Sequence, residues 1–238
     1  MIKTPVLRSQ PIARRAAITL FSGAAMLLLT AAAPWSSTVS RNSIGAHVIG
    51  NPAAKVTLVE YFSYTCGACG RFAISSDAPL TSDYVSKGLV QVEYRNMLRD
   101  PLDMVAALLA RCGRASAFHG NHQAIFAAQP AWIGKVQAAS EAQQKSWYDG
   151  PVNQRTKRIA TDSGLFALMQ ARGYSEAQLD ACLTSEAATS AVIGMTNIGQ
   201  NTDHVRGTPS FFINGKQVVN SVEWSAVKSA LDLALKPV

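Results

Sequence analysis

The sequence predicts an α/β fold with a central mixed β-sheet, flanking helices and a helical insertion. Three observations carry this prediction: a buried strand leads straight into a C-x-x-C pair, a second strand precedes a long helical stretch, and the chain closes with a hairpin and a helix. Hydrophobic residues make up 48% of the 238 residues and charged residues only 16%, which indicates a globular chain rather than a disordered one.

The N-terminal segment has the composition of an export signal. Residues 1–15 are basic and contain no acid, residues 16–33 carry no charge, and the run ends in small residues. We expect residues 1–33 to be a cleaved signal peptide or, alternatively, a retained inner-membrane anchor, because the apolar run just reaches the length of a membrane span. Both alternatives place the rest of the chain in the periplasm, an oxidising compartment. Residues 34–46 are small and polar and are expected to form a flexible leader.

The net charge of +7 does not indicate a nucleic-acid partner. Without residues 1–33 the net charge falls to +3. No basic run with interleaved aromatic residues remains, so no nucleic-acid interface is expected.

The first part of the predicted sheet lies within residues 47–100. Residues 56–62 are β-branched or aromatic almost throughout, which predicts a buried strand. Cys66-Gly-Ala-Cys69 then opens a segment that suits a helix. Residues 89–94 alternate between apolar and polar side chains, as a second strand does. Together these segments form a strand–helix–strand unit.

An inserted helical domain is predicted over residues 101–196. Asp100 and Pro101 form a helix start, with the aspartate as N-cap and the proline in the first turn. Further along, Ser175 and Gln178 have the spacing of a capping box.

Residues 197–238 are expected to complete the sheet. Asn214-Gly215 separates two strand-like runs, residues 210–213 and 217–219, and this dipeptide is typical of a hairpin turn. Apolar residues spaced three and four apart then predict a final amphipathic helix. They are Trp224, Val227, Leu231 and Leu235.

The Cys66–Cys69 pair at a predicted helix start indicates thiol–disulfide chemistry. Free N–H groups and the positive end of a helix stabilise a thiolate, so Cys66 is the expected nucleophile and Cys69 the resolving thiol. A zinc site would need a second close pair of ligands, and none accompanies Cys112 or Cys182. Copper(I) binding by both sulfurs stays open, as does a peptide-binding module with a disulfide that does not exchange. The exchange reaction requires no cofactor, and no metal ligands are assigned.

Two motifs give a more specific indication. Residues 50–69 (GNPAAKVTLVEYFSYTCGAC) and residues 205–215 (VRGTPSFFING) resemble motifs of the DsbA-like family of thiol–disulfide oxidoreductases, within the thioredoxin superfamily. The resemblance covers residues 46–236 and includes the helical insertion. It implies a thioredoxin fold and an enzyme that exchanges disulfides with unfolded or partly folded exported proteins. It also implies a membrane redox partner that returns the cysteines to their starting state.

The resemblance implies roles for individual residues as well. It implies that Pro209 is a cis-proline beside the C-x-x-C pair, and that the Thr208 backbone pairs with a substrate peptide in strand-like fashion. Glu60 alternates onto the inner face of its strand and resembles the family's buried proton relay to the resolving cysteine. The alternative is an edge glutamate that points to solvent.

Cys112 and Cys182 are expected to face the interior of the helical insertion. Each shares a helical face with apolar neighbours, namely Val105, Leu108 and Leu109 for the first and Leu179 and Leu183 for the second. Relatives in the family often join such helices by a structural disulfide. The alternative is a pair of free, buried thiols.

Two departures from the family leave the direction of electron flow open. Strongly oxidising members commonly carry Pro-His between the cysteines, whereas Gly67 and Ala68 offer the Cys66 thiolate only backbone groups. Thr208 before the proline is typical of isomerases and of some reductases. Disulfide donation is the expected role, with isomerase or reductase activity as the alternative.

Overall fold

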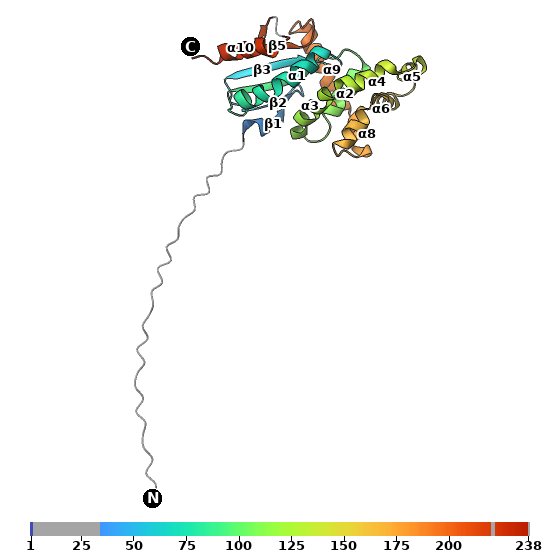
Figure 1. The fold of residues 1–238 in the computed structure, drawn as a ribbon, viewed down its shortest axis with the longest axis horizontal. Coiled ribbons are helices and arrows are strands. Elements are labelled where there is room, and N and C mark those ends of the chain that lie inside the picture. The colour runs from blue at the N-terminus through green and yellow to red at the C-terminus, as the bar shows by residue number, and fades with distance from the viewer. Residues whose placement is uncertain (2–33, 220–221, 238) are drawn as a thin grey trace. The chain divides into compact units, whose positions relative to one another are not determined.

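The computed structural model describes residue 1, residues 34–219 and residues 222–237 (Figure 1). The predicted signal peptide or anchor, apart from Met1, lies outside the described residues. The described part contains a six-stranded sheet in the order β1-β2-β4-β3-β5-β6. Its strands are β1 (Val39–Arg41), β2 (His47–Ile49), β3 (Val56–Phe62), β4 (Val90–Asn96), β5 (Ser210–Ile213) and β6 (Lys216–Val218).

The sheet is mixed, as predicted. Strands β3 and β4 run parallel, from the pair Val56 and Val90 to the pair Phe62 and Asn96, while β2 joins β4 and β5 joins β3 antiparallel. Only Thr57 of β3 is more than slightly exposed. An almost fully buried central strand explains the nearly unbroken β-branched and aromatic sequence of this segment.

The expectation that residues 34–46 form a flexible leader is wrong. Trp35–Ser37 form a 3-10 turn, and β1 pairs antiparallel with β2. The connection between the two strands passes through Gly45, whose φ of 77° lies in the left-handed region that favours glycine. Three-residue strands with little hydrophobic alternation leave no pattern from which a strand is predicted.

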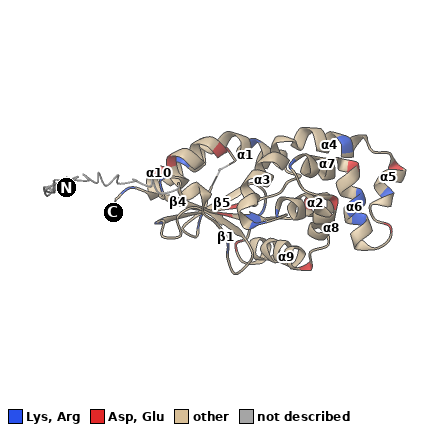
Figure 2. Cartoon of the chain, turned by 90° about the horizontal axis from the view of Figure 1, so that it is seen from below, with Lys and Arg blue, Asp and Glu red and all other residues tan. Residues whose placement is uncertain are grey.

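Helices follow the order expected from the sequence. They are α1 (Gly67–Leu80), α2 (Pro101–Ala110), α3 (Phe118–Ala127), α4 (Gln129–Ala138), α5 (Glu141–Ser146), α6 (Val152–Ser163), α7 (Leu165–Ala171), α8 (Glu176–Leu183), α9 (Glu186–Asn201) and α10 (Trp224–Ala234). Helices α1 and α9 lie on opposite sides of the sheet (Figure 2). Phe72 of α1 packs against Phe211 of β5, whereas Gly199 of α9 approaches the Tyr61 ring of β3 on the other side.

The predicted helix and turn signals are confirmed. Asp100 is the N-cap of α2, and Ser175 and Gln178 form the capping box of α8. Asn214 and Gly215 have φ values of 49° and 79°, as a tight hairpin turn between twisted strands requires. The local rules of capping and turn formation therefore operate here as the sequence indicates.

A single hydrophobic cluster extends from the sheet into the helical insertion. The division into a core of residues 47–100 with 197–238 and an inserted domain of residues 101–196 stays a prediction. Helix α2 begins at its expected boundary, whereas α9 continues past residue 196 to Asn201 and packs against β4. The continuous packing places the insertion directly against the end of β3, where the C-x-x-C pair lies.

Candidate active site

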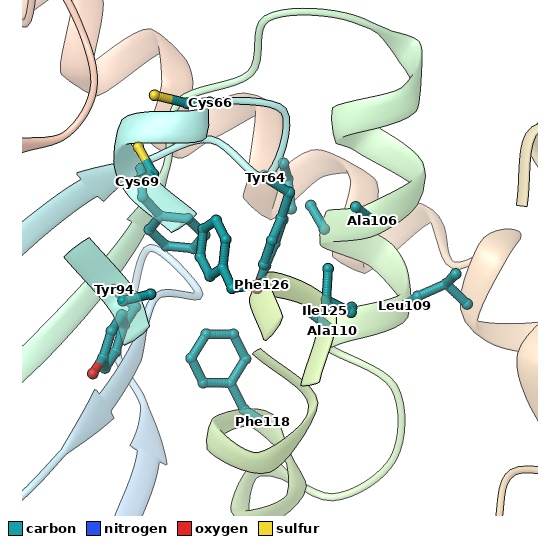
Figure 3. Close-up of a cluster of buried hydrophobic side chains, with 14 of the residues drawn as sticks. Tyr64, Cys66, Cys69, Tyr94, Ala106, Leu109, Ala110, Phe118, Ile125 and Phe126 are labelled. Carbon is teal, nitrogen blue, oxygen red and sulfur yellow. The ribbon is translucent and has the colours of Figure 1, made fainter. Parts of the chain in front are cut away.

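The two cysteines lie at the start of α1, as the sequence predicts. Cys66 is the N-cap residue with an extended backbone, and Cys69 lies in the first helical turn. Both sulfurs lie at this end of the helix, beside the aromatic cluster that includes Tyr64 and Phe126 (Figure 3). Both are free thiols, and Cys66 is 7% exposed whereas Cys69 is fully buried. An incoming sulfur therefore reaches Cys66 before it reaches Cys69.

The two thiols have opposite acid–base behaviour. A hydrogen bond from the Cys69 thiol, together with Thr208 and the backbone N–H groups of Ala68 and Cys69, lowers the pKa of Cys66 to about 5. Burial raises the pKa of Cys69 far above its ordinary value of 9.0, and the hydrogen bond to Cys66 raises it further. At neutral pH Cys66 is therefore a thiolate and Cys69 a thiol. Backbone N–H groups at the helix start therefore help to stabilise the Cys66 thiolate, as expected for cysteines separated only by Gly67 and Ala68.

The loop before β5 lies against Cys66. The Thr208–Pro209 peptide bond is cis, as the resemblance implies, and the Thr208 carbonyl lies 3.2 Å from the Cys66 Sγ atom. An open pocket of about 390 Å³ lies beside this contact. Its lining consists of Cys66, Met97, Leu98, Arg99, Arg206, Gly207 and Thr208. The partly exposed Thr208 thus borders a space that leads to the nucleophilic sulfur.

A second pocket adjoins the turn that precedes Cys66. It measures about 330 Å³, includes Thr65, and is lined mainly by apolar side chains of the insertion. Leu102, Ile133, Val136, Trp147 and Ile159 supply the apolar surface. Two open pockets therefore adjoin the segment that carries Cys66.

Asp103 holds the active-site turn from the insertion side. Its buried carboxylate accepts hydrogen bonds from the Ser63 hydroxyl at 2.6 Å, the Tyr64 N–H at 2.8 Å and the Arg99 N–H at 3.1 Å. Burial raises the pKa of Asp103 to about 7 despite these donors. No sequence signal distinguishes this residue from an ordinary acid in the first turn of a helix.

Gln129 holds the same turn from α4. Its side-chain NH₂ group donates to the Tyr64 carbonyl at 2.6 Å and to the Cys66 carbonyl at 3.0 Å. Its side chain fills the space beside Gly70, where an added Cβ would lie 2.3 Å from the Gln129 Oε1 atom. The glutamine lies 63 residues from Cys66 in sequence. Because that contact is long-range, the sequence offers no pattern from which to infer it.

Glu60 lies inside the protein, on strand β3, six residues before Cys66 in the sequence. Its side chain is 3% exposed, and its Oε1 atom has no hydrogen-bond partner within the described residues. Burial raises the pKa of Glu60 to about 8, so the carboxyl group is largely protonated at neutral pH. It borders a cavity of about 10 Å³, room for roughly one water, together with Ala73 of α1. The alternative of a solvent-facing edge glutamate is wrong, because β3 is a central strand.

Cys112 and Cys182 form a disulfide away from this site. Their S–S distance is 1.98 Å, and the bond links the end of α2 to α8. The Cys112 carbonyl accepts hydrogen bonds from Asn121 at 3.2 Å and from the Tyr174 hydroxyl at 3.1 Å. The alternative of two free thiols is therefore wrong. The sequence-predicted residues thus separate into one redox cluster and one remote disulfide.

No group of three or more His, Cys, Asp or Glu side chains in the described part of the chain converges as metal ligands would. No helix there is long and apolar enough to cross a membrane.

Comparison with known sequences gives one family and several relatives. A family model described as thioredoxin matches residues 42–233. A putative protein-disulfide oxidoreductase of Rickettsia felis is 29% identical over 191 residues, which cover 79% of this chain and 60% of that protein. A putative protein-disulfide oxidoreductase of Rickettsia bellii is 27% identical over 190 residues, covering 64% of its length. The chain thus spans less than two thirds of these curated relatives.

Comparison with solved structures agrees with the sequence matches. A protein-disulfide isomerase from Novosphingobium aromaticivorans superposes with a TM-score of 0.77 and 38% identity, over 81% of this chain and 98% of that chain. The α-DsbA1 protein of Wolbachia pipientis shares the fold, with a TM-score of 0.61 and 17% identity over 82% of this chain and 93% of that chain.

Proposed function

Since the chain belongs to the thioredoxin family and is similar to protein-disulfide oxidoreductases and to a protein-disulfide isomerase, we propose that it exchanges disulfides with exported proteins through Cys66 and Cys69. The observation that carries this proposal is the pairing at one helix start of a slightly exposed, low-pKa thiol with a fully buried, high-pKa one. A nucleophile and a resolving thiol need these two different environments. We assign the enzyme to the periplasm, with disulfide donation as its role.

The proposed reaction begins with the Cys66–Cys69 disulfide. A substrate thiolate attacks the Cys66 sulfur and forms a mixed disulfide, while Cys69 leaves as a thiolate and takes up a proton. A second substrate thiol loses its proton, attacks the substrate sulfur and displaces the Cys66 thiolate. The substrate gains a disulfide, and two electrons pass to the cysteine pair. A membrane redox partner then removes these electrons, which completes the cycle.

The lowered pKa of Cys66 is one factor in the direction of electron flow. Stabilising a thiolate favours the reduced pair over its disulfide, so a lower pKa makes the pair more oxidising. The value of about 5 lies between about 7 for the reductant thioredoxin and about 3.5 for the strong oxidant DsbA. A relative described as an isomerase supports the alternative, that the same steps rearrange or reduce substrate disulfides.

Substrate contacts follow from the spaces around Cys66. Thr208 presents backbone beside the sulfur, so an extended peptide has a strand-like partner there. The apolar pocket that includes Thr65 suits the exposed hydrophobic side chains of a protein not yet folded. We assign Gly67 and Ala68 to the same substrate-facing edge, because Gly67 is exposed and has no side chain and Ala68 is partly exposed and small.

Glu60 is proposed as the proton relay of Cys69. A protonated carboxyl donates to the Cys69 thiolate as it leaves, and the carboxylate accepts that proton when Cys69 attacks in the reverse direction. The small cavity beside Glu60 has room for one water, with Ala73 one helical turn beyond Cys69 in its wall.

The equilibrium reduction potential of Cys66–Cys69 tests the proposal. The purified protein is equilibrated in glutathione buffers and scored by alkylation mass shifts, with Cys112 and Cys182 counted separately. We expect a potential of roughly −120 to −180 mV, typical of oxidants and oxidising isomerases. A potential below about −230 mV would place the protein among reductants and reverse the proposed direction of electron flow. Failure of the Cys66–Cys69 pair to equilibrate with glutathione would contradict the proposal that the protein is a thiol–disulfide exchange enzyme.

A further inference from the structure

Two arginines meet where the N-terminal hairpin packs against the insertion. Arg41 ends β1, and Arg111 follows α2 as its C-cap residue. Arg111 is 7% exposed and donates to the Gly45 carbonyl at 2.5 Å, while its Nη1 lies 3.4 Å from His47 Nδ1. Arg41 donates to His47 Nε2 at 3.1 Å and to the Arg111 carbonyl at 3.4 Å. Every one of these acceptors is uncharged.

The positive charge of this pair has no carboxylate counterpart in the described part of the chain. No ion pair joins either arginine to an acid there, and the buried Nε of Arg111 has no acceptor. Burial and the charge of Arg41 lower the pKa of Arg111 to about 10, and His47, with a pKa lowered to about 2, is neutral. The end of α2 offers only about half an elementary charge in compensation. Arg111 is thus a buried cation without an anionic partner, which is costly and calls for an anion.

An open pocket of about 370 Å³ lies beside these two side chains. Both arginines line it, as do Cys182 and the beginning of α9. Ser185, the N-cap of the 16-residue helix α9, lines the pocket, and its hydroxyl accepts the Ala188 N–H. Glu186, the acid of that first turn, lines a different pocket, with Val152 and Leu183.

We infer that this pocket binds a dianionic oxyanion, a phosphate or sulfate group carried by a small molecule. Two guanidinium groups match a double negative charge, and their planar forks suit paired oxygens. The N-terminal end of α9 adds a partial positive charge that also favours an anion. The remaining wall is apolar and small, with Leu108, Ala188 and Ala191, and leaves room for an organic remainder. Binding at this pocket is independent of the chemistry at Cys66.

Titration with inorganic phosphate tests this site. The purified protein is titrated calorimetrically at constant ionic strength, with sodium chloride replaced stepwise by phosphate. We expect saturable binding of one phosphate, weakened at least tenfold by Arg41→Gln, which alters an exposed residue and spares the buried one. Arg111→Lys keeps the charge but loses the fork, and weakens binding as well. The control is Arg114→Gln, an exposed arginine three residues further on that does not line the pocket.

Two results overturn the inference. One is phosphate that acts no differently from chloride, and the other is an equal loss of binding in Arg114→Gln. Glutathione exchange at Cys66–Cys69, measured on the same samples, separates this question from the enzyme proposal. If Arg41→Gln keeps glutathione exchange but loses phosphate binding, the result supports the phosphate site independently of the proposed enzyme activity.

Discussion

At the scale of single residues, the site depends on three ionisable groups with divergent pKa values. The Cys69 thiol, Thr208 and the backbone N–H groups lower the pKa of Cys66, whereas burial raises the pKa values of Cys69 and Glu60. Glu60 is the proposed group for proton transfer at Cys69, and its pKa of about 8 lies close to physiological pH.

Glu60→Gln is expected to slow the attack of Cys69 on a Cys66–glutathione mixed disulfide by about 100-fold, the lower range for a lost general base. In the parent protein the rate rises as the pH passes through about 8, because the carboxylate that accepts the proton forms there. The glutamine variant loses this step in the pH profile. Stopped-flow release of glutathione measures both.

Glu93→Gln is the matched control for that experiment. Glu93 is also buried in the sheet, but it pairs with Arg95 at 2.7 Å. Equal slowing in both variants would show that the sheet tolerates neither change and that Glu60 is no relay.

At the scale of elements, the turn before α1 is held by two helices of the insertion. Asp103 of α2 accepts from the Ser63 hydroxyl and the Tyr64 N–H, and Gln129 of α4 donates to the carbonyls of Tyr64 and Cys66 in the same turn. Their separation along the chain means that the nucleophile is positioned by packing between elements rather than by its own helix alone.

Gln129→Leu is expected to raise the pKa of Cys66, because the freed carbonyl lets the helix start relax away from the thiolate. Asn121→Leu is the matched control: Asn121 is also a buried amide that donates to two carbonyls, those of Ala110 and Cys112. Each variant should lose about 1–3 kcal/mol of stability. The pH dependence of Cys66 alkylation separates them, and an unchanged midpoint in Gln129→Leu contradicts a positioning role.

Local patterns predicted the elements that form the site but not the side chains that hold it. The run of residues 56–62, the Asp100 cap and the Asn214-Gly215 turn are properties of neighbouring residues, so the sequence alone suffices. The Gln129 contact depends on how α4 packs, and the β1 strand depends on pairing at a sheet edge. Neither leaves a periodic pattern in the sequence.

At the scale of the whole molecule, the Cys112–Cys182 disulfide closes a loop with a sequence separation of 70 within the insertion. A bond of that span contributes roughly 4 kcal/mol on the chain-entropy model. Its sulfurs take no part in the cluster around Cys66, so stability and exchange are expected to be separable.

A double variant, Cys112→Ser with Cys182→Ser, should melt at a lower temperature yet keep its rate of glutathione exchange at Cys66. Calorimetry and the exchange assay check the two halves of this expectation on one preparation. Loss of exchange in a double variant that is still folded would show that the Cys112–Cys182 disulfide takes part in the exchange reaction and would contradict a purely structural role.

The hold of Asp103 and Gln129 on the active-site turn has a consequence for modularity. A minimal protein made by excising residues 101–196 would retain both reactive cysteines, Glu60 and the Thr208–Pro209 loop. It would lose both side chains that bind the polar groups of Ser63, Tyr64 and Cys66. The helical insertion is thus not a separable module, because its side chains and the thioredoxin-fold core together hold the turn that carries Cys66.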